Sequence, residues 1–170
     1  MSIVEMIDLR KTVRRGERLL GLDLGSKTIG LAISDSGFTI ASPLETIQRK
    51  KFTADVLALK AIIDERQIGG LVLGLPKNMD GSDGPRVQST RQFATNLMER
   101  FDIPIAFWDE RLSTMAIERI LVIEADMSRQ KRRAVVDKMA ASYILQGALD
   151  LIASQSGQAG LRDRHYDRDG

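Results

Sequence analysis

The sequence predicts an α/β fold: one mixed five-stranded sheet in the strand order 3-2-1-4-5, with helices on both faces. Two patterns predict it. In the first part of the chain, short apolar runs are separated by tight turns, as in three antiparallel strands joined by hairpins. Further along, apolar runs alternate with stripes at helical spacing, as in strand–helix–strand units. A chain that combines the two patterns forms one sheet with helices packed against each side.

The first two strands, 19–25 and 28–35, are separated only by GSK, which leaves room for nothing but a hairpin. After a second turn, TIASPLETI supplies a third strand that is expected to end near Pro43. The apolar runs GGLVLGL at 69–75 and IPIAFWD at 103–109 have the character of buried parallel strands.

Two helices are indicated by apolar stripes, namely Phe52, Val56, Leu59 and Ile63, then Val87, Thr90, Ala94, Leu97 and Phe101. Two more are expected at about 113–125 and 134–153. We expect residues 1–18 to form an N-terminal extension and residues 19–153 to form the folded domain. The polar segment 154–170 is expected to be disordered.

Composition restricts the chemistry available to the chain. It has 170 residues, a formal net charge of +2, no cysteine and one histidine, His165, in the polar C-terminal segment. Disulfides, thiolate nucleophiles, zinc fingers and iron–sulfur clusters are excluded, and histidine acid–base chemistry is disfavoured. No apolar run approaches the roughly 18 residues of a membrane span, so a cytoplasmic location is expected. Catalysis would have to use carboxylates, lysines, hydroxyls or a hard metal ion.

Asp23 lies inside the apolar strand LLGLDLG. Alternation places it with Gly21 and Gly25 on the face opposite the leucines. An isolated buried carboxylate is costly, and small neighbours leave space beside it, which favours a bound metal or ligand. The alternative is a strand-end aspartate that accepts hydrogen bonds from the adjacent turn.

Further acids follow later elements. Asp109 and Glu110 come after a strand, where open α/β sheets bind ligands, and only one of two adjacent side chains can enter a site. Asp137 is expected in about the first turn of the last helix, on the side of Ala140 and Ala141. The alternative reading of these acids is a favourable interaction with a helix N-terminus.

Acids at the ends of three elements, without histidine or cysteine, are typical of a Mg²⁺ or Mn²⁺ site. We expect Asp23, Glu110 and Asp137 to hold metal, which could then promote phosphodiester hydrolysis. Several polar and basic residues could bind a nucleic-acid backbone. They are Lys27, Lys77, Asn78, Arg86, Arg111 and, in the run RQKRR just before the last helix, Arg129, Lys131, Arg132 and Arg133. The alternative for such a charge run is a solvated loop.

Five motifs occur together: GLDLGSKTIGLAISD, ASPLETI, GLPKNMDGSDGPR, WDERLST and VDKMAASYILQGALD. In order and spacing, over about residues 19–151, they resemble the YqgF family of pre-16S ribosomal RNA nucleases and Holliday-junction-resolvase-like proteins. The resemblance implies an RNase H-like fold and metal-dependent phosphodiester hydrolysis. Asp23 matches the first-strand acid, Asp109 and Glu110 the acids of the DER motif, and Asp137 the last-helix acid, with Glu110 favoured within its pair. Thr28 departs from the family, since many members have arginine there.

The resemblance therefore implies a nuclease that processes the 5′ end of pre-16S rRNA during ribosome biogenesis. Alternatives are a Holliday-junction DNA resolvase and a non-catalytic RNA-binding assembly factor. A sugar-kinase or actin-type nucleotide site is disfavoured, because that architecture needs two such domains. Expected partners are nucleic acid and the ribosomal particle, with the chain a monomer or homodimer and no membrane involved.

Overall fold

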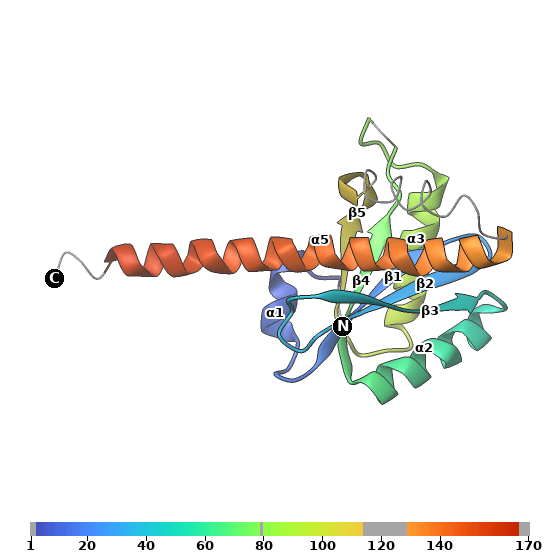
Figure 1. Ribbon diagram of the computed structural model, residues 1–170, viewed down its shortest axis with the longest axis horizontal. Helices are drawn as coiled ribbons and strands as arrows, with labels where there is room; N and C mark the ends of the chain where they lie inside the picture. Colours follow the sequence, from blue (N-terminus) through green and yellow to red (C-terminus); the bar gives the residue numbers. More distant parts are fainter. Residues whose placement is uncertain (1–2, 79, 114–128, 167–170) are drawn as a thin grey trace.

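The structure, a computed structural model, describes residues 3–78, 80–113 and 129–166, the last range as backbone alone before 136 and after 155. Its centre is a five-stranded sheet in the order β3-β2-β1-β4-β5 (Figure 1). The strands are β1 (Arg18–Leu24), β2 (Thr28–Ser34), β3 (Ala41–Gln48), β4 (Ile68–Leu75) and β5 (Ile105–Asp109). Strand β2 is antiparallel to β1 and β3, whereas β4 is parallel to β1 and β5. The predicted order and strand directions are confirmed.

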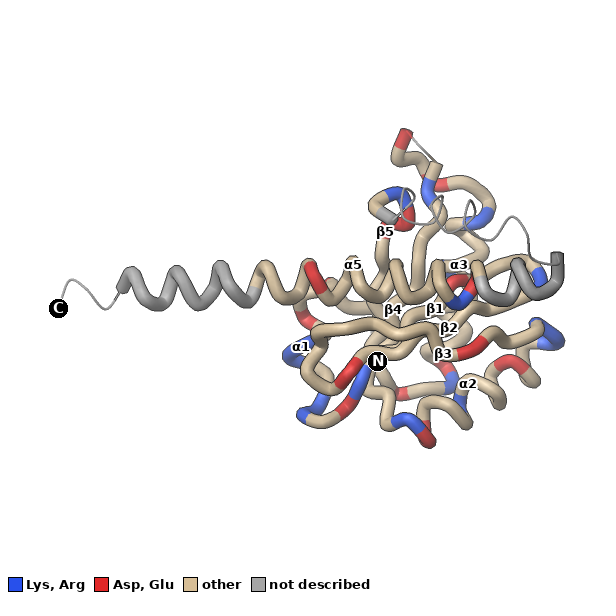
Figure 2. Tube along the Cα trace, viewed as in Figure 1, with Lys and Arg blue, Asp and Glu red and all other residues tan. Residues whose placement is uncertain are grey.

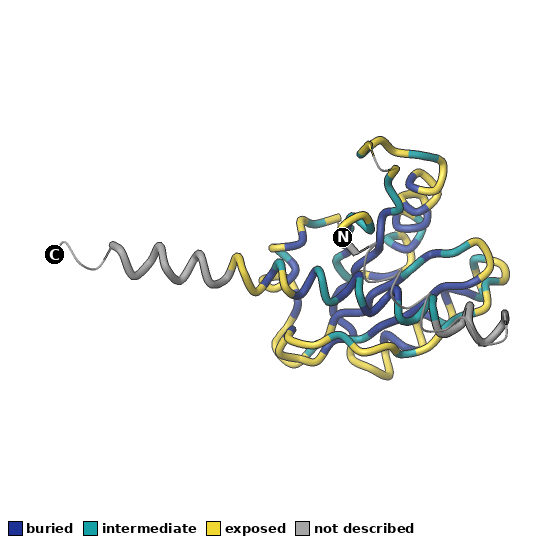
Figure 3. Tube along the Cα trace, turned by 45° about the horizontal axis from the view of Figure 1, so that its top comes forward, coloured by how far each residue is buried: buried dark blue, intermediate teal, exposed yellow. Residues whose placement is uncertain are grey.

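Helices cover both faces of the sheet, as predicted. The apolar side chains of α2 (Phe52–Arg66) and α3 (Pro85–Met98) pack with Leu20, Leu22 and Leu24 of β1 into one core. On the other face, α5 (Arg129–Tyr166) packs over β1, β2 and β3 in a second core with Val72 and Trp108. The buried segments are concentrated in the sheet between these layers (Figure 3). No helix in the described ranges is long and apolar enough to cross a membrane.

The N-terminal extension packs against the domain. Residues Met6–Asp8 form a short 3₁₀ helix, η1, and Leu9–Thr12 form one helical turn, α1. Met6, Leu9 and Val13 are buried in the same core as α5. Their side chains cover apolar surface of the sheet that would otherwise be exposed to water. The Val4 amide also donates to the Ile105 carbonyl at 2.9 Å, which places the start of the chain beside β5.

Some element boundaries differ from the expectations. Strand β3 continues through Pro43 to Gln48, because it is an edge strand and its pairing with β2 shifts by one residue beside the proline. Helix α5 begins at Arg129 and continues to Tyr166, so the range 154–166 is helical where disorder was expected. After β5, a 3₁₀ helix, η2, spans Glu110–Ser113. Most of the helix expected at 113–125 lies outside the described residues.

Gly30 in β2 allows α5 to approach the sheet closely. It pairs with Asp23 of β1, and a Cβ atom on Gly30 would lie 2.1 Å from the backbone oxygen of Asp137 in α5. Heavy atoms cannot come so close, so any side chain at this position would push the helix away from the sheet. The absent side chain therefore fixes where Asp137 lies relative to Asp23.

Replacing Gly30 by alanine is expected to lower the free energy of unfolding by about 3 kcal/mol or more, because the neighbour to be displaced is helix backbone. Urea denaturation followed by circular dichroism measures the loss. Gly37→Ala, in an exposed turn where the added carbon would have 3.3 Å to its nearest neighbour, is the matched control. Equal stabilities of the two variants would contradict the close packing described here.

Candidate active site

Three of the predicted acids lie near one another at one end of the sheet. Asp23 is the penultimate residue of β1, and Glu110 directly follows β5. Because β1, β4 and β5 are parallel, their carboxyl ends lie along the same edge. Gly74 of β4 lies between the two acids, and a Cβ there would be 2.5 Å from Oε1 of Glu110. The bare glycine therefore leaves room for the Glu110 side chain to reach over β4 to Asp23.

Asp23 and Glu110 share a hydrogen bond, which requires one of them to keep its proton. Burial, the charge of Glu110 and the hydrogen bond with it, and the charge of Asp137 together raise the pKa of Asp23 to about 8, against the opposing effect of Arg86. Burial also raises the pKa of Glu110, whereas its hydrogen bond with Asp23 and the charge of Arg86 lower it. We therefore assign the shared proton to Asp23, which donates it to the Glu110 carboxylate.

Asp137 is held from the other side, by Thr28. The Thr28 hydroxyl donates a short hydrogen bond to Oδ2 of Asp137, across 109 positions of sequence. Thr28 is buried, with 5% of its surface exposed, at the start of β2. In the sequence, Thr28 stands out only as a departure from the arginine that many family members have at this position. Asp137 itself is the ninth residue of α5, further from the helix start than expected, since α5 begins at Arg129.

Asp109 faces Arg111 and not the Asp23–Glu110 pair. Nη2 of Arg111 lies 2.5 Å from Oδ2 of Asp109, and Nε lies 3.0 Å from both carboxylate oxygens. These hydrogen bonds hold the pKa of Asp109 below its usual value. Asp109 is therefore an ionised partner that fixes the guanidinium of Arg111 in place.

The residues fit a hard divalent cation, although they do not form a closed cage. In the described ranges, no three acidic or histidine side chains stand close enough together to ligate one ion. Mg²⁺ is usually bound through one or two carboxylates, with waters and substrate phosphates completing its shell. Asp23 and Glu110 supply such a pair of oxygen ligands, and a cation beside them would relieve the crowding of negative charge that raises the pKa of Asp23.

A cleft of about 490 Å³ opens beside Glu110. We call it the acidic-end cleft; its lining residues are Pro76, Lys77, Asn78, Gly84, Pro85, Arg86, Glu110 and Arg111. Four residues predicted to contact nucleic acid therefore line the same cleft as Glu110, a predicted catalytic residue; they are Lys77, Asn78, Arg86 and Arg111. Lys77 also lies 3.6 Å from Asp83, in the loop between β4 and α3, which carries one lysine and two aspartates (Figure 2).

The other predicted contacts lie elsewhere. Lys27 is exposed in the hairpin between β1 and β2 and does not line the cleft. Arg129, Lys131, Arg132 and Arg133 lie in the first turns of α5, where a loop before the helix was expected, and their side chains are outside the description. Two residues that sequence reasoning missed have a part in this region: Thr28, and Arg49, which binds the β1–β2 hairpin.

An RNase H-like sheet with carboxylates at the end of its first strand and on the covering helix defines a class, that of the RNase H-like nucleases and resolvases. The chain belongs to the RuvX family, described as Holliday junction resolvase, whose family model matches residues 17–151. This agrees with the resemblance seen in its motifs.

Named relatives are consistent with this membership, and a solved structure has a similar fold. A protein of Paramagnetospirillum magneticum is 60% identical over 88% of this chain and 96% of its own length. A protein of Rhodospirillum centenum is 51% identical over 98% of this chain and 91% of its own length. Both bear the provisional name pre-16S rRNA nuclease. The fold is similar to that of the yeast mitochondrial Holliday junction resolvase Ydc2, with a TM-score of 0.57 and 12% identity over 94% of this chain and 88% of that one.

Asp23→Asn is expected to stabilise the metal-free protein at neutral pH. The folded state keeps a proton on Asp23 that the unfolded chain releases above its ordinary pKa of 3.8, so stability falls as pH rises from there to about 8. Asparagine removes this dependence. Urea unfolding in the presence of a chelator, at several pH values between 4 and 8, should show an advantage of the variant that grows with pH.

Asp109→Asn is the control for that measurement, and its expected effect on stability at neutral pH is the opposite of that of Asp23→Asn. The pKa of Asp109 is lowered by Arg111, so its stabilising effect is present above pH 3.8 and is lost as pH falls through the depressed value. This variant should be less stable than wild type at neutral pH. If Asp23→Asn shows the same direction, the shared proton is wrongly assigned.

Thr28→Val keeps the shape of the side chain but removes the donor to Asp137. We expect a loss of about 1.5–3 kcal/mol in the free energy of unfolding, because a hydrogen bond to a charged group is broken. Thr28→Ser keeps the hydroxyl and should lose only about 1 kcal/mol, the contribution of a buried methyl group. Guanidinium denaturation distinguishes them, and a valine variant as stable as the serine variant would show that the bond contributes little.

Proposed function

We propose that this chain is a divalent-metal-dependent nuclease that hydrolyses phosphodiester bonds in pre-16S rRNA during processing of its 5′ end. The observation that favours it is the half-buried Asp23–Glu110 pair beside a cleft lined by Lys77, Arg86 and Arg111. The names of relatives at 51–60% identity over most of their length support the RNA substrate.

Each acid would have a distinct part. Asp23 and Glu110 would hold Mg²⁺ or Mn²⁺, and Asp137, whose charge acts on Asp23, would add negative charge near the ion. The bound metal would supply activation of water and stabilisation of the leaving oxygen of the phosphodiester. Metal binding would require Asp23 to give up its proton, because a carboxylate ligates a cation in its ionised form. Thr28 holds Oδ2 of Asp137, which restricts how that side chain can turn. Asp109 holds Arg111 at the wall of the cleft.

The basic residues would bind and orient the strand. Arg86 lines the cleft, and its charge acts on both Asp23 and Glu110. A phosphate group bound to Arg86 would therefore lie near the two acids. Lys77 and Arg111 add positive charge on the same cleft. Contacts of this kind recognise the backbone without reading sequence.

A branched DNA substrate is the second candidate, favoured by the description of the family as Holliday junction resolvase. The cleft does not distinguish an RNA substrate from a DNA substrate, because both present the same phosphodiester charge to Lys77, Arg86 and Arg111. Substrate choice therefore has to come from a direct comparison of the two nucleic acids.

The test is cleavage of a labelled RNA carrying the 5′ leader of 16S rRNA and of a four-way DNA junction, with and without Mg²⁺. We expect metal-dependent cleavage of the RNA and a loss of about 10³-fold in rate for Asp23→Asn, equivalent to roughly 4 kcal/mol of barrier. Mg²⁺ should also raise the melting temperature of wild type more than that of Asp23→Asn, because it binds the folded state.

Glu65→Gln, an exposed acid on α2, is the control and should cleave like wild type. Undiminished cleavage by Asp23→Asn, or cleavage in the presence of a chelator, would refute the proposed mechanism. Preference for the junction would indicate the resolvase, and metal-independent RNA binding without cleavage would indicate an assembly factor.

A further inference from the structure

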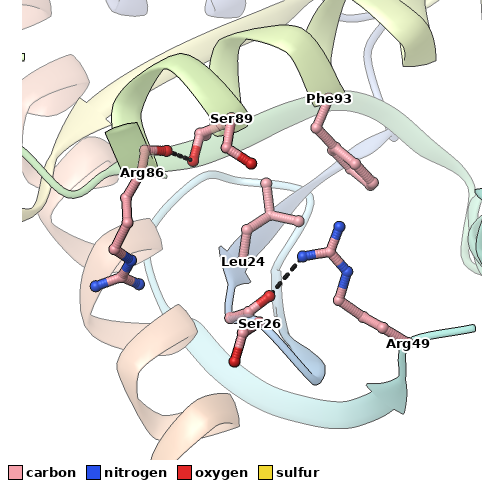
Figure 4. A pocket seen from close by; sticks show the side chains of 8 residues that line it. Leu24, Ser26, Arg49, Arg86, Ser89 and Phe93 are labelled. Atoms are coloured by element: carbon pink, nitrogen blue, oxygen red, sulfur yellow. Dashed lines mark hydrogen bonds between the residues drawn. The ribbon is translucent and has the colours of Figure 1, made fainter. Parts of the chain in front are cut away.

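A second pocket lies beside the acidic-end cleft, at the hairpin between β1 and β2 (Figure 4). We call it the hairpin pocket. It has a volume of about 200 Å³ and is lined by Leu24, Gly25, Ser26, Arg49, Arg86, Ser89, Thr90 and Phe93. Leu24 directly follows Asp23 in the chain, and Arg86 lines both the pocket and the cleft. The two hollows are therefore neighbours joined at one arginine.

Arg49 is held in place at the wall of this pocket. Its backbone amide donates to the Lys27 carbonyl at 2.8 Å, and its Nη1 donates to the Gly25 carbonyl at 2.5 Å. Its guanidinium carbon lies 5.6 Å from the centre of the Phe93 ring, a cation–π contact. A guanidinium has five N–H donors, so these contacts leave donors for a ligand. The side chain is thus oriented before anything binds, which lowers the entropy cost of binding.

The chemistry of the wall favours an anion. Arg49 and Arg86 both reach the pocket, and none of the residues that line it is acidic. Neither arginine forms an ion pair with a carboxylate in the described part of the chain. Ser26 and Ser89 are exposed and present hydroxyl groups there. Two guanidinium groups with nearby hydroxyls match the oxygens of a phosphate group.

We propose that the hairpin pocket binds a phosphate group of the nucleic-acid strand, next along from the one that is cleaved, and that Arg49 is its main contact. This inference rests on the proposed function. Arg86 connects the pocket to the cleft, so a strand that passes Arg86 reaches Arg49 without leaving the surface. Leu24 and Phe93 add an apolar wall suited to a sugar or base, which a free phosphate ion would leave unused.

The experiment measures binding of a short single-stranded RNA to the full-length chain with Asp23→Asn, which prevents cleavage, over a range of salt concentrations. Adding Arg49→Ala should weaken binding about tenfold, as expected for one charge-assisted hydrogen bond. It should also reduce the slope of log K against log salt by about 0.7, the value for one phosphate contact on a single strand. Arg49→Lys keeps the charge and should restore most of the slope.

Arg66→Ala removes the same charge at the exposed end of α2, which leads into β4 at the opposite end of the sheet, and should leave the slope unchanged. In cleavage assays with Asp23 intact, Arg49→Ala should raise KM and leave kcat close to wild type, because the contact is equal in ground and transition states. Thermal melting verifies that Arg49→Ala remains folded, and the lysine variant tests the charge even if the alanine variant does not fold.

Equal slopes for Arg49→Ala and Arg66→Ala would overturn the inference, as would an Arg49→Lys slope as low as that of alanine. Titration with inorganic phosphate distinguishes the source of the ligand. Phosphate binding lost in Arg49→Ala, with an unchanged RNA slope, would mean a site for the free ion and would also overturn it. If wild type cleaves RNA but Arg49→Ala leaves the salt slope unchanged, only the phosphate site in the hairpin pocket is refuted. If Arg49→Ala lowers the salt slope but wild type never cleaves, the nuclease proposal is refuted and the phosphate site is supported.

Discussion

The close contact between α5 and the sheet is the constraint on which the rest of the site depends. Asp137 can hydrogen-bond with Thr28 only because its backbone oxygen rests over Gly30, where no side chain intervenes. Gly30 pairs with Asp23, so the same contact sets the position of the helix acid relative to the strand acid. Gly74 has the equivalent effect for Glu110 on the neighbouring strand. Two glycines, on the two strands that flank β1, thus determine where three carboxylates lie.

These carboxylates destabilise the metal-free fold. Asp23 is half-buried beside one acid and near another, and its partial burial and these two neighbours together raise its pKa to about 8. The apolar cores on the two faces of the sheet offset the cost, since both are built from fully buried side chains such as Leu22 and Ile144. Stability and the capacity to bind a cation are therefore opposed at this end of the sheet.

The parts of the structure that follow from a local pattern could be predicted from sequence. Alternation in LLGLDLG indicated the face of Asp23, and the two helical stripes indicated the core of α2 and α3. The direction of Glu110 relative to Asp109 also agrees with the expected alternation. The contacts of Thr28 and Arg49 could not be predicted, because each depends on how closely distant elements approach. The start of α5 was missed because the run RQKRR has no apolar face to reveal a helical period.

The position of Asp137 in the chain has a consequence for when the protein becomes competent. During synthesis, the three parallel strands and both Asp23 and Glu110 emerge before α5 does, and the N-terminal residues alone then cover part of the sheet face on which α5 packs. Contacts between residues as far apart as Thr28 and Asp137 form late, since long loops must close first. A nascent chain would therefore hold two of the acids without the third, and the complete set would come together only when the last helix docks.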